Sequence, residues 1–250
     1  LAFFTETYED ADNSSKVGLK LVVSASALSK NLAQLAALPS EIISETDFSD
    51  VAKIKDILTQ RRIGMEQSFA QAGHSAAMAR LSSYCQPAGV LREQLGGVNY
   101  YRFLKELLAR FDEEASTLPQ RLESLAARIF TRTNLTMSFA GAREDYHAFW
   151  NLLEDLPEGK AAESELVIPE PRILNEAFIV PTDICYAAKG FDRRQLEGIA
   201  PYTAAWQAGA RALTYDYLWN EVRVRRCLRR RIPSKPHRRP ALLLVPRPAS

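Results

Sequence analysis

The stretch TDFSDVAKIKDILTQRRIGMEQSFA, residues 46–70, predicts a long amphipathic helix. Its first five residues are rich in Thr, Ser and Asp, which cap helix N-termini. Apolar side chains then recur every three to four residues, which places them on one helical face; they are Ile54, Ile57, Leu58, Met65 and Phe69. The pattern runs towards Tyr84. Pro87 is expected to stop it, because proline has no N–H for the helical hydrogen bond.

Shorter elements are expected on both sides of this helix. Two strands over 3–8 and 17–24 flank the hairpin-like loop 10–15, and a helix capped by Ser26 or Ser29 is expected to end at Pro39. Further helices are predicted over 90–95 (ended by a left-handed Gly96-Gly97 cap), 100–111, 119–130 and 143–156, with a strand over 134–140. This order indicates an α+β fold, an antiparallel sheet with helices on one face.

The chain is expected to divide at a polar, proline-flanked linker. We predict one domain over 1–160, a linker over 161–171, and over 172–224 the start of a second α/β domain, with a strand near 176–188 and a helix over 202–224. Residues 225–250 show no amphipathic period, contain five prolines, and are not expected to build a core.

Composition excludes several classes of protein. With 46% hydrophobic and 25% charged residues the chain is typical of a globular protein, and no apolar run approaches the roughly 20 residues that span a bilayer. The first residues resemble no signal peptide and suggest a cut inside a longer chain. The three cysteines are scattered, and the histidines (His74, His147 and His237) form no H-x-x-x-H or H-x-x-E-H pair.

Charge is distributed unevenly between the body and the tail. Residues 225–250 hold nine Lys and Arg and no Asp or Glu. The other 23 Lys and Arg residues face 30 Asp and Glu, so residues 1–224 carry a net charge of −7. A basic tail is often an interaction segment, and binding to nucleic acid through phosphate contacts is one interpretation of it. The tail has no aromatic residue for base stacking, which disfavours that interpretation.

Three segments carry a resemblance to a known family. They read TDFSDxxKIKDILxQ (46–60), MEQSFxxxGHSxAMARLSSY (65–84) and EQLGGVNYYRFLKEL (93–107). The chain resembles the presequence-protease (falcilysin-like) branch of the insulinase/pitrilysin zinc metallopeptidases. The resemblance implies that 1–160 is most of the third of four homologous domains, the peptidase-associated one, and that 172–224 begins the fourth.

The resemblance also implies a function. The family members are zinc endopeptidases that enclose short unstructured peptides between two halves, with an H-x-x-E-H motif in the first half. That motif is absent here, so zinc belongs to the intact family protein and none is expected on this chain. The expected partners are the zinc-bearing half and peptide substrates, with no nucleic acid and no membrane. A soluble protein of a bacterial cytoplasm or organelle matrix is expected, inactive alone. A non-catalytic subunit of a split peptidase is the alternative.

One site residue follows from the resemblance. The family pattern LWxxVRVxGGAYG places an arginine and a tyrosine near the substrate carbonyl. LWNEVRVR (218–225) matches its first part and puts Arg223 on the family's arginine, although an arginine at a helix end is also favoured by the helix dipole alone. The match then stops, and Arg229 stands where the tyrosine is expected.

The genetic code offers an explanation for this break. Arg225 to Arg230 can be encoded CGG-CGG-TGC-CTA-CGG-CGC, which one base later reads Gly-Gly-Ala-Tyr-Gly, the missing motif. Residues 243–249 can likewise conceal Tyr-Ser-Phe-Arg-Asp-Pro. We therefore predict that residues from about 225 onward are a frameshift product, that the chain is a fragment, and that it unfolds from about Glu176 onward because its sheet is incomplete.

Overall fold

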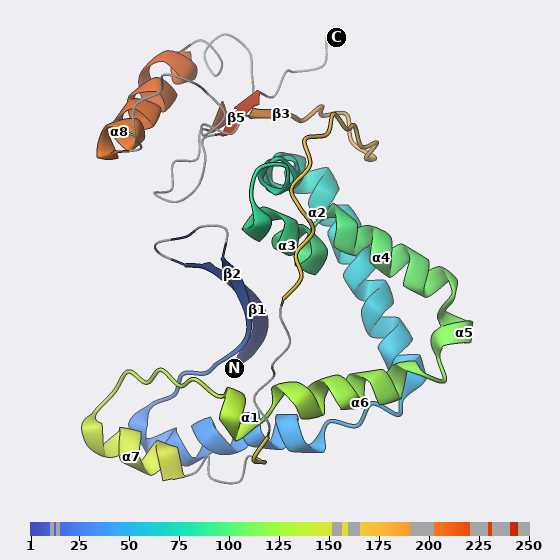
Figure 1. Ribbon diagram of the computed structural model, residues 1–250, viewed down its shortest axis with the longest axis vertical. Coiled ribbons are helices and arrows are strands. Elements are labelled where there is room, and N and C mark those ends of the chain that lie inside the picture. Colours follow the sequence, from blue (N-terminus) through green and yellow to red (C-terminus); the bar gives the residue numbers. More distant parts are fainter. Residues whose placement is uncertain are drawn as a thin grey trace. The chain divides into compact units, whose positions relative to one another are not determined.

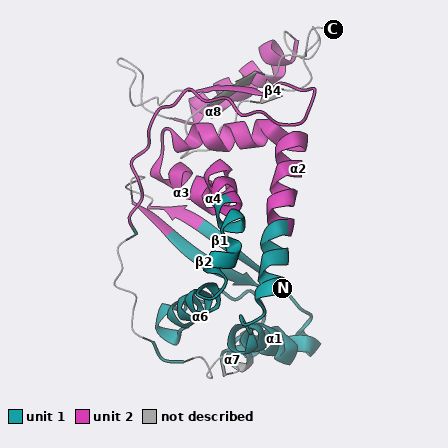
Figure 2. Ribbon diagram, turned by 90° about the vertical axis from the view of Figure 1, so that its right-hand side faces the viewer, with its two compact units in different colours: residues 1–6, 19–59, 106–166 teal, residues 7–18, 60–105, 167–250 magenta. Residues whose placement is uncertain are grey.

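The structure is a computed structural model, shown in Figure 1. It describes residues 1–10, 13, 16–151, 157–159, 166–190, 203–220, 230–231 and 241–244. The chain divides into two compact units: Leu1–Glu6, Leu19–Thr59 and Glu106–Leu166 form one, and Thr7–Gly18, Gln60–Lys105 and Val167–Ser250 form the other (Figure 2). Helices dominate and a two-stranded sheet accompanies them, so the predicted α+β class is confirmed.

The predicted N-terminal hairpin is confirmed. Strands β1 (Ala2–Glu9) and β2 (Val17–Ser24) pair with each other. The Asn13 N–H donates to Asp10 Oδ1 at 3.0 Å, which is the hairpin-loop chemistry expected of an aspartate in a turn. The sheet is smaller than predicted, since the strand expected over 134–140 does not form. A 3-10 turn η2 (Arg132–Asn134) stands there instead, and the residues after it have no regular structure.

Helix α1 corrects one prediction. A 3-10 turn η1 (Ser29–Asn31) leads into α1 (Leu32–Glu45), which continues through Pro39 rather than ending there. A proline inside a helix removes one hydrogen bond. Packing of α1 against α7 (Arg143–Asn151) provides contacts that the local pattern does not show. The last residues of the helix predicted over 143–156 lie outside the described part of the chain.

The long predicted helix is confirmed as α2 (Val51–Ser83). Asp50 caps it, because its Oδ1 accepts the Lys53 N–H at 2.9 Å. Pro87 begins α3 (Pro87–Gly96) in the first-turn position that tolerates proline. The left-handed cap predicted at Gly96-Gly97 is wrong: Gly97 has φ −97°. Helices α4 (Val98–Ala109), α5 (Phe111–Glu114) and α6 (Leu118–Ile129) follow.

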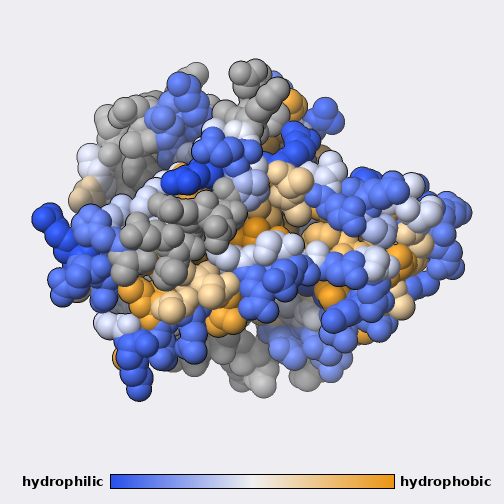
Figure 3. Space-filling view, turned by 90° about the horizontal axis from the view of Figure 1, so that it is seen from below, coloured by the Kyte–Doolittle hydropathy of each residue, from blue (hydrophilic) through white to orange (hydrophobic). Residues whose placement is uncertain are grey.

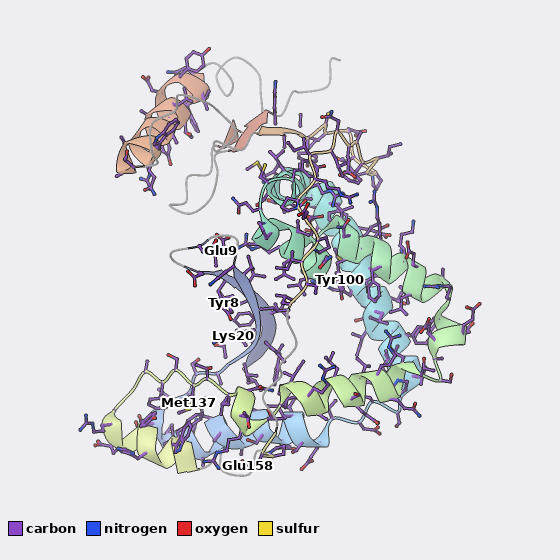
Figure 4. The ribbon with its side chains drawn as sticks, in the orientation of Figure 1. Tyr8, Glu9, Lys20, Tyr100, Met137 and Glu158 are labelled. Carbon is purple, nitrogen blue, oxygen red and sulfur yellow. The ribbon has the colours of Figure 1, made fainter. Side chains whose placement is uncertain are left out.

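The best-packed region comprises α2, α3 and α4. An added Cβ at Gly89 would lie 2.5 Å from the Ser82 carbonyl oxygen, so the α3 and α2 backbones touch where glycine leaves room. Arg92 of α3 also holds the end of β1, through Thr7 Oγ1 at 2.9 Å and the Glu9 carboxylate at 3.6 Å; Figure 4 labels Glu9 there. The buried apolar side chains of these helices are Met65, Ala88, Val90, Leu91, Val98, Leu104 and Leu107.

A second sheet is built partly from the tail. Its order is β3 (Ala187–Gly190), β5 (Ala241–Leu244), β4 (Arg230–Arg231), and both pairings are antiparallel. The register sets Ala187 opposite Leu244. The expectation that the tail builds nothing is therefore wrong for these two segments, which give β3 the partner that its hydrogen-bonding edge requires. The strand predicted over 176–188 is limited to β3.

The helix predicted over 202–224 forms in part. It consists of α8 (Ala204–Ala212) followed by a π-helical turn, η4 (Leu213–Tyr217). Leu218 beyond it is 1% exposed, whereas Trp219 is 49% exposed. The predicted linker shows no regular structure where it is described, at 157–159 and 166–171.

Candidate functional site

The site residue expected from the sequence, Arg223, lies outside the described residues, as does Arg229 at the position of the missing tyrosine. The described part of that motif ends at Leu218, Trp219 and Asn220. The Asn220 side-chain N–H donates to the Asp216 carbonyl at 2.7 Å, which closes the last helical turn. The role of Arg223 remains a prediction.

The described residues do not fit a zinc ion. Within residues that the structure places, no three or more His, Cys, Asp or Glu side chains gather as metal ligands. The His74 ring lies 6.0 Å from the Tyr186 ring and the His147 ring 5.4 Å from the Tyr146 ring, centroid to centroid, so each has an aromatic neighbour. His237 lies outside the described residues. No chemical step through zinc follows from this chain's own residues.

The described residues do form one polar cluster, which centres on the guanidinium of Arg80 in α2. Arg80 is 8% exposed. Its Nε and Nη2 donate to the two carboxylate oxygens of Glu176, at 2.6 and 2.9 Å. Its Nη1 donates to Glu93 Oε2 at 3.2 Å and to Asn99 Oδ1 at 3.0 Å. The Tyr84 hydroxyl donates to Glu176 Oε2 at 2.6 Å. One arginine therefore joins two carboxylates, one of them bidentately.

Glu93 connects this cluster to the start of α4. It is 1% exposed, and its Oε2 accepts the Val98 N–H at 3.1 Å, so the carboxylate caps the helix that begins there. Its other oxygen, Oε1, is buried without a hydrogen-bond partner. An unsatisfied oxygen at a buried carboxylate is costly, so this atom is an unused acceptor inside the cluster.

Burial and charge set the ionisation of the cluster. Burial is the main cause that raises the pKa of the Glu93 carboxyl, which Arg80 only partly offsets. The hydrogen bonds from Arg80 lower the pKa of Glu176. Desolvation, with the hydrogen bond to Glu176, raises the pKa of Tyr84 to about 12. Glu176 is therefore held as the anion and Tyr84 as a neutral donor, an arrangement that binds and positions chain segments.

Glu176 belongs to an extended segment, residues 167–186, which we call the strap. It has no regular secondary structure. Three of its side chains attach it to the helices. Glu176 binds Arg80, Phe178 lies 5.5 Å from the Arg102 guanidinium, and the Tyr186 hydroxyl donates to the Ala70 carbonyl at 3.1 Å. The Tyr186 ring fills the space beside Gly73, where a Cβ would lie 2.4 Å from it.

Sequence reasoning missed this cluster. Arg80 and Glu176 are 96 residues apart, and no local pattern announces such a pair. Two signals were available. Arg80, Tyr84, Glu93 and Asn99 all lie in the quoted segments 65–84 and 93–107, and Glu93 stands five residues before the start of α4.

Apolar side chains are also exposed in number. Figure 3 shows patches of them on one face. Ile179 of the strap is fully exposed, Val167 is 84% exposed, and Leu125 of α6 is 51% exposed. Among the described helices none combines the length and the apolarity that a membrane crossing requires.

Comparison with known proteins follows the same segments. Residues 1–107 match the peptidase-associated family of peptidase family M16, subfamily C. The chain is 28% identical to "Protein HypA" of Clostridium perfringens over 90% of its length. It is 28% identical to "Presequence protease 1, chloroplastic/mitochondrial" of Arabidopsis thaliana over 82%, and to the mitochondrial presequence protease of Yarrowia lipolytica over 79%. It spans 23%, 19% and 20% of these relatives, about a fifth of their length.

The helical layout of residues 51–109 and these matches agree, and they define a protein of the peptidase-associated class. Within that class the chain belongs to the presequence-protease-like family, as its similarity extends well beyond the matched residues 1–107. The resemblance predicted from residues 46–107 is thereby confirmed.

Proposed function

We propose that this chain forms part of the non-zinc half of a zinc-dependent metallopeptidase, that it helps to enclose short unstructured peptides, and that it is inactive alone. The observation that carries the proposal is the match of residues 1–107 to the peptidase-associated family, extended by relatives named presequence proteases over 79–82% of the chain. In this proposal the metal and the general base come from a zinc-bearing half, because the chain has no H-x-x-E-H motif.

Arg223 has the site role in this proposal. Its guanidinium would donate to the substrate carbonyl, where charge develops in the transition state. Arg229 has no phenolic hydroxyl to add a second donor. The compartment proposed is an organelle matrix or a bacterial cytoplasm, which is supported by relatives named for mitochondria and chloroplasts and by one from a bacterium.

The altered reading frame belongs to the same proposal. The coding DNA around codons 220–250 should continue the family motif in the plus-one frame, and an H-x-x-E-H motif should lie upstream of the codon for Leu1. Sequencing of the gene decides both points. A sound present frame, with no zinc motif encoded in the gene or beside it, would count against a frameshifted peptidase.

Reconstitution tests the function itself. The chain, the zinc-bearing segment, and the two together are assayed on an unstructured fluorogenic peptide. We expect hydrolysis with both present, loss of it with a zinc chelator, and none with the chain alone. Replacing Arg223 by Ala should lower kcat/KM of the mixture about 10²- to 10³-fold, the range for loss of one oxyanion donor. Hydrolysis by the chain alone, or no gain over the zinc-bearing segment, would refute the proposal.

A further inference from the structure

The strap is held by polar contacts rather than by a core of its own. Ile173 is 67% exposed and Ile179 fully exposed, so their side chains gain little from burial. Within the strap the Thr182 N–H donates to the Val180 carbonyl at 2.9 Å, and the Ile184 N–H to Thr182 Oγ1 at 3.3 Å. Its attachment therefore depends on Glu176, Phe178 and Tyr186. Detaching it exposes little new apolar surface.

The cost of detachment depends on what happens to Arg80. A buried guanidinium that loses its carboxylate partner is strongly unfavourable. Arg80 would not be left unpaired, because Nη1 already donates to Glu93 and Asn99. Glu93 Oε1 lies buried beside it with no hydrogen-bond partner. A carboxylate with one unused oxygen next to a planar guanidinium is half of a bidentate pair.

We propose that Arg80 is a two-position latch: it holds the strap through Glu176 in the closed state and, when the strap leaves, turns to bind both oxygens of Glu93. The two states conserve the charge pairing of Arg80 and differ in which carboxylate forms the fork. Glu93 Oε1, unsatisfied in the closed state, gains a donor in the open state. This gain offsets part of what Glu176 loses, so the states are close enough in free energy to interchange.

The neighbouring contacts are consistent with a latch at this point. Tyr84 and Arg102 both act on Glu176: Tyr84 donates a hydrogen bond, and the charge of Arg102 contributes to its lowered pKa. Tyr186 binds the Ala70 carbonyl two residues before the kink of α2 at Ala72 (φ −134°, ψ 39°). The strap ends at Tyr186, directly before β3, so its release would free the entry to β3 from α2. The inference holds whether or not the chain serves a peptidase.

Two substitutions on the same arginine separate the latch from a static ion pair. Glu176→Gln weakens the closed state, and strap amides should exchange hydrogen at least about tenfold faster, the effect of losing a charged hydrogen bond. Glu93→Gln keeps an acceptor for the Val98 N–H but removes the second carboxylate oxygen that the open state needs. Strap amides should then exchange about threefold more slowly, since a neutral acceptor bonds roughly half as strongly. A static network predicts faster exchange in both variants.

Hydrogen–deuterium exchange of the full chain gives the readout, with peptides from α2 and α4 as the internal standard for global stability. Glu170→Gln, an exposed carboxylate of the same strap, is the matched control and should change nothing. Should Glu176→Gln disturb the helices, Tyr84→Phe removes one hydrogen bond to Glu176 and should still raise strap exchange above helix exchange. The latch is refuted if Glu93→Gln speeds strap exchange, or if neither Glu176→Gln nor Tyr84→Phe alters it.

Discussion

Helices α3 and α6 have similar sequences in outline but different surroundings. They have 10 and 12 residues, and each has a proline in its first turn. Helix α3 buries five residues, which are Ala88, Gly89, Val90, Leu91 and Glu93. Helix α6 buries none, although Leu118, Leu122, Leu125 and Ile129 recur at helical spacing. An amphipathic pattern therefore specifies a helix without specifying what covers it.

The polar contacts of the two helices differ in the same way. Glu93 of α3 is sealed against Arg80, with exposed fractions of 1% and 9% for the two side chains. Arg121 of α6 meets Glu114 at 3.3 Å with 68% and 31% exposed, where water competes for both charges. Stability should therefore be concentrated in α2, α3 and α4, and α6 should contribute little in this chain by itself.

The same substitution in the two helices tests this difference most directly. Leu91→Ala in α3 should lower the free energy of unfolding by about 2–5 kcal/mol, because Leu91 is 4% exposed and its removal leaves a cavity. Leu125→Ala in α6 should change it by less than about 0.5 kcal/mol. Urea unfolding followed by circular dichroism measures both. Equal losses would show that α6 is packed in solution and would end the contrast.

A glycine pair sharpens the comparison at the backbone. A Cβ at Gly89 of α3 would lie 2.5–2.8 Å from backbone atoms of Ser82 and Ser83, which cannot move aside cheaply. Gly89→Ala should therefore cost about 1–3 kcal/mol. Gly64→Ala in α2 is the control: nothing lies within 4 Å of its Cβ, and the better helix former should stabilise by about 0.4–1 kcal/mol. Thermal unfolding of both variants should shift in opposite directions.

Local chemistry predicted these helices well where a start or stop signal was decisive. Asp50 caps α2 and Pro87 separates it from α3, so both boundaries could be predicted. Pro39 misled, because packing of α1 on α7 outweighs the lost hydrogen bond. The alternation over 134–140 misled as well, since a strand also needs a partner and none pairs with those residues among the described strands.

The candidate site was less predictable than the fold. The ion pair of Arg80 with Glu176 joins residues 96 apart, which no periodicity encodes. The prediction that order ends near Glu176 overlooked this anchor: the strap is attached through Glu176 and again through Tyr186. The segments that carried the family resemblance located four residues of the cluster without indicating that they meet. Arg223, the residue that the resemblance did indicate, lies outside the described residues.

Acid provides the gentlest test of the contrast, because it acts on the buried carboxylates that α6 lacks. Arg80 holds the pKa of Glu176 below its ordinary value of 4.5, so the stabilisation by this pair is complete above pH 4.5 and is lost as the pH falls through the lower, folded value. Burial raises the pKa of Glu93, so its contribution has the opposite sign: it is present below pH 4.5 and is lost as the pH rises through the raised value.

These opposite signs can be separated by two variants. Unfolding free energies are measured between about pH 3 and about pH 7. Glu176→Gln should flatten the fall of stability at the acid end, because the pair that titrates there is gone. Glu93→Gln should flatten the decline on the neutral side and leave the acid end as it was. If both variants changed the same end, the two carboxylates would titrate as one unit, and α3 would owe its stability to packing of apolar side chains alone.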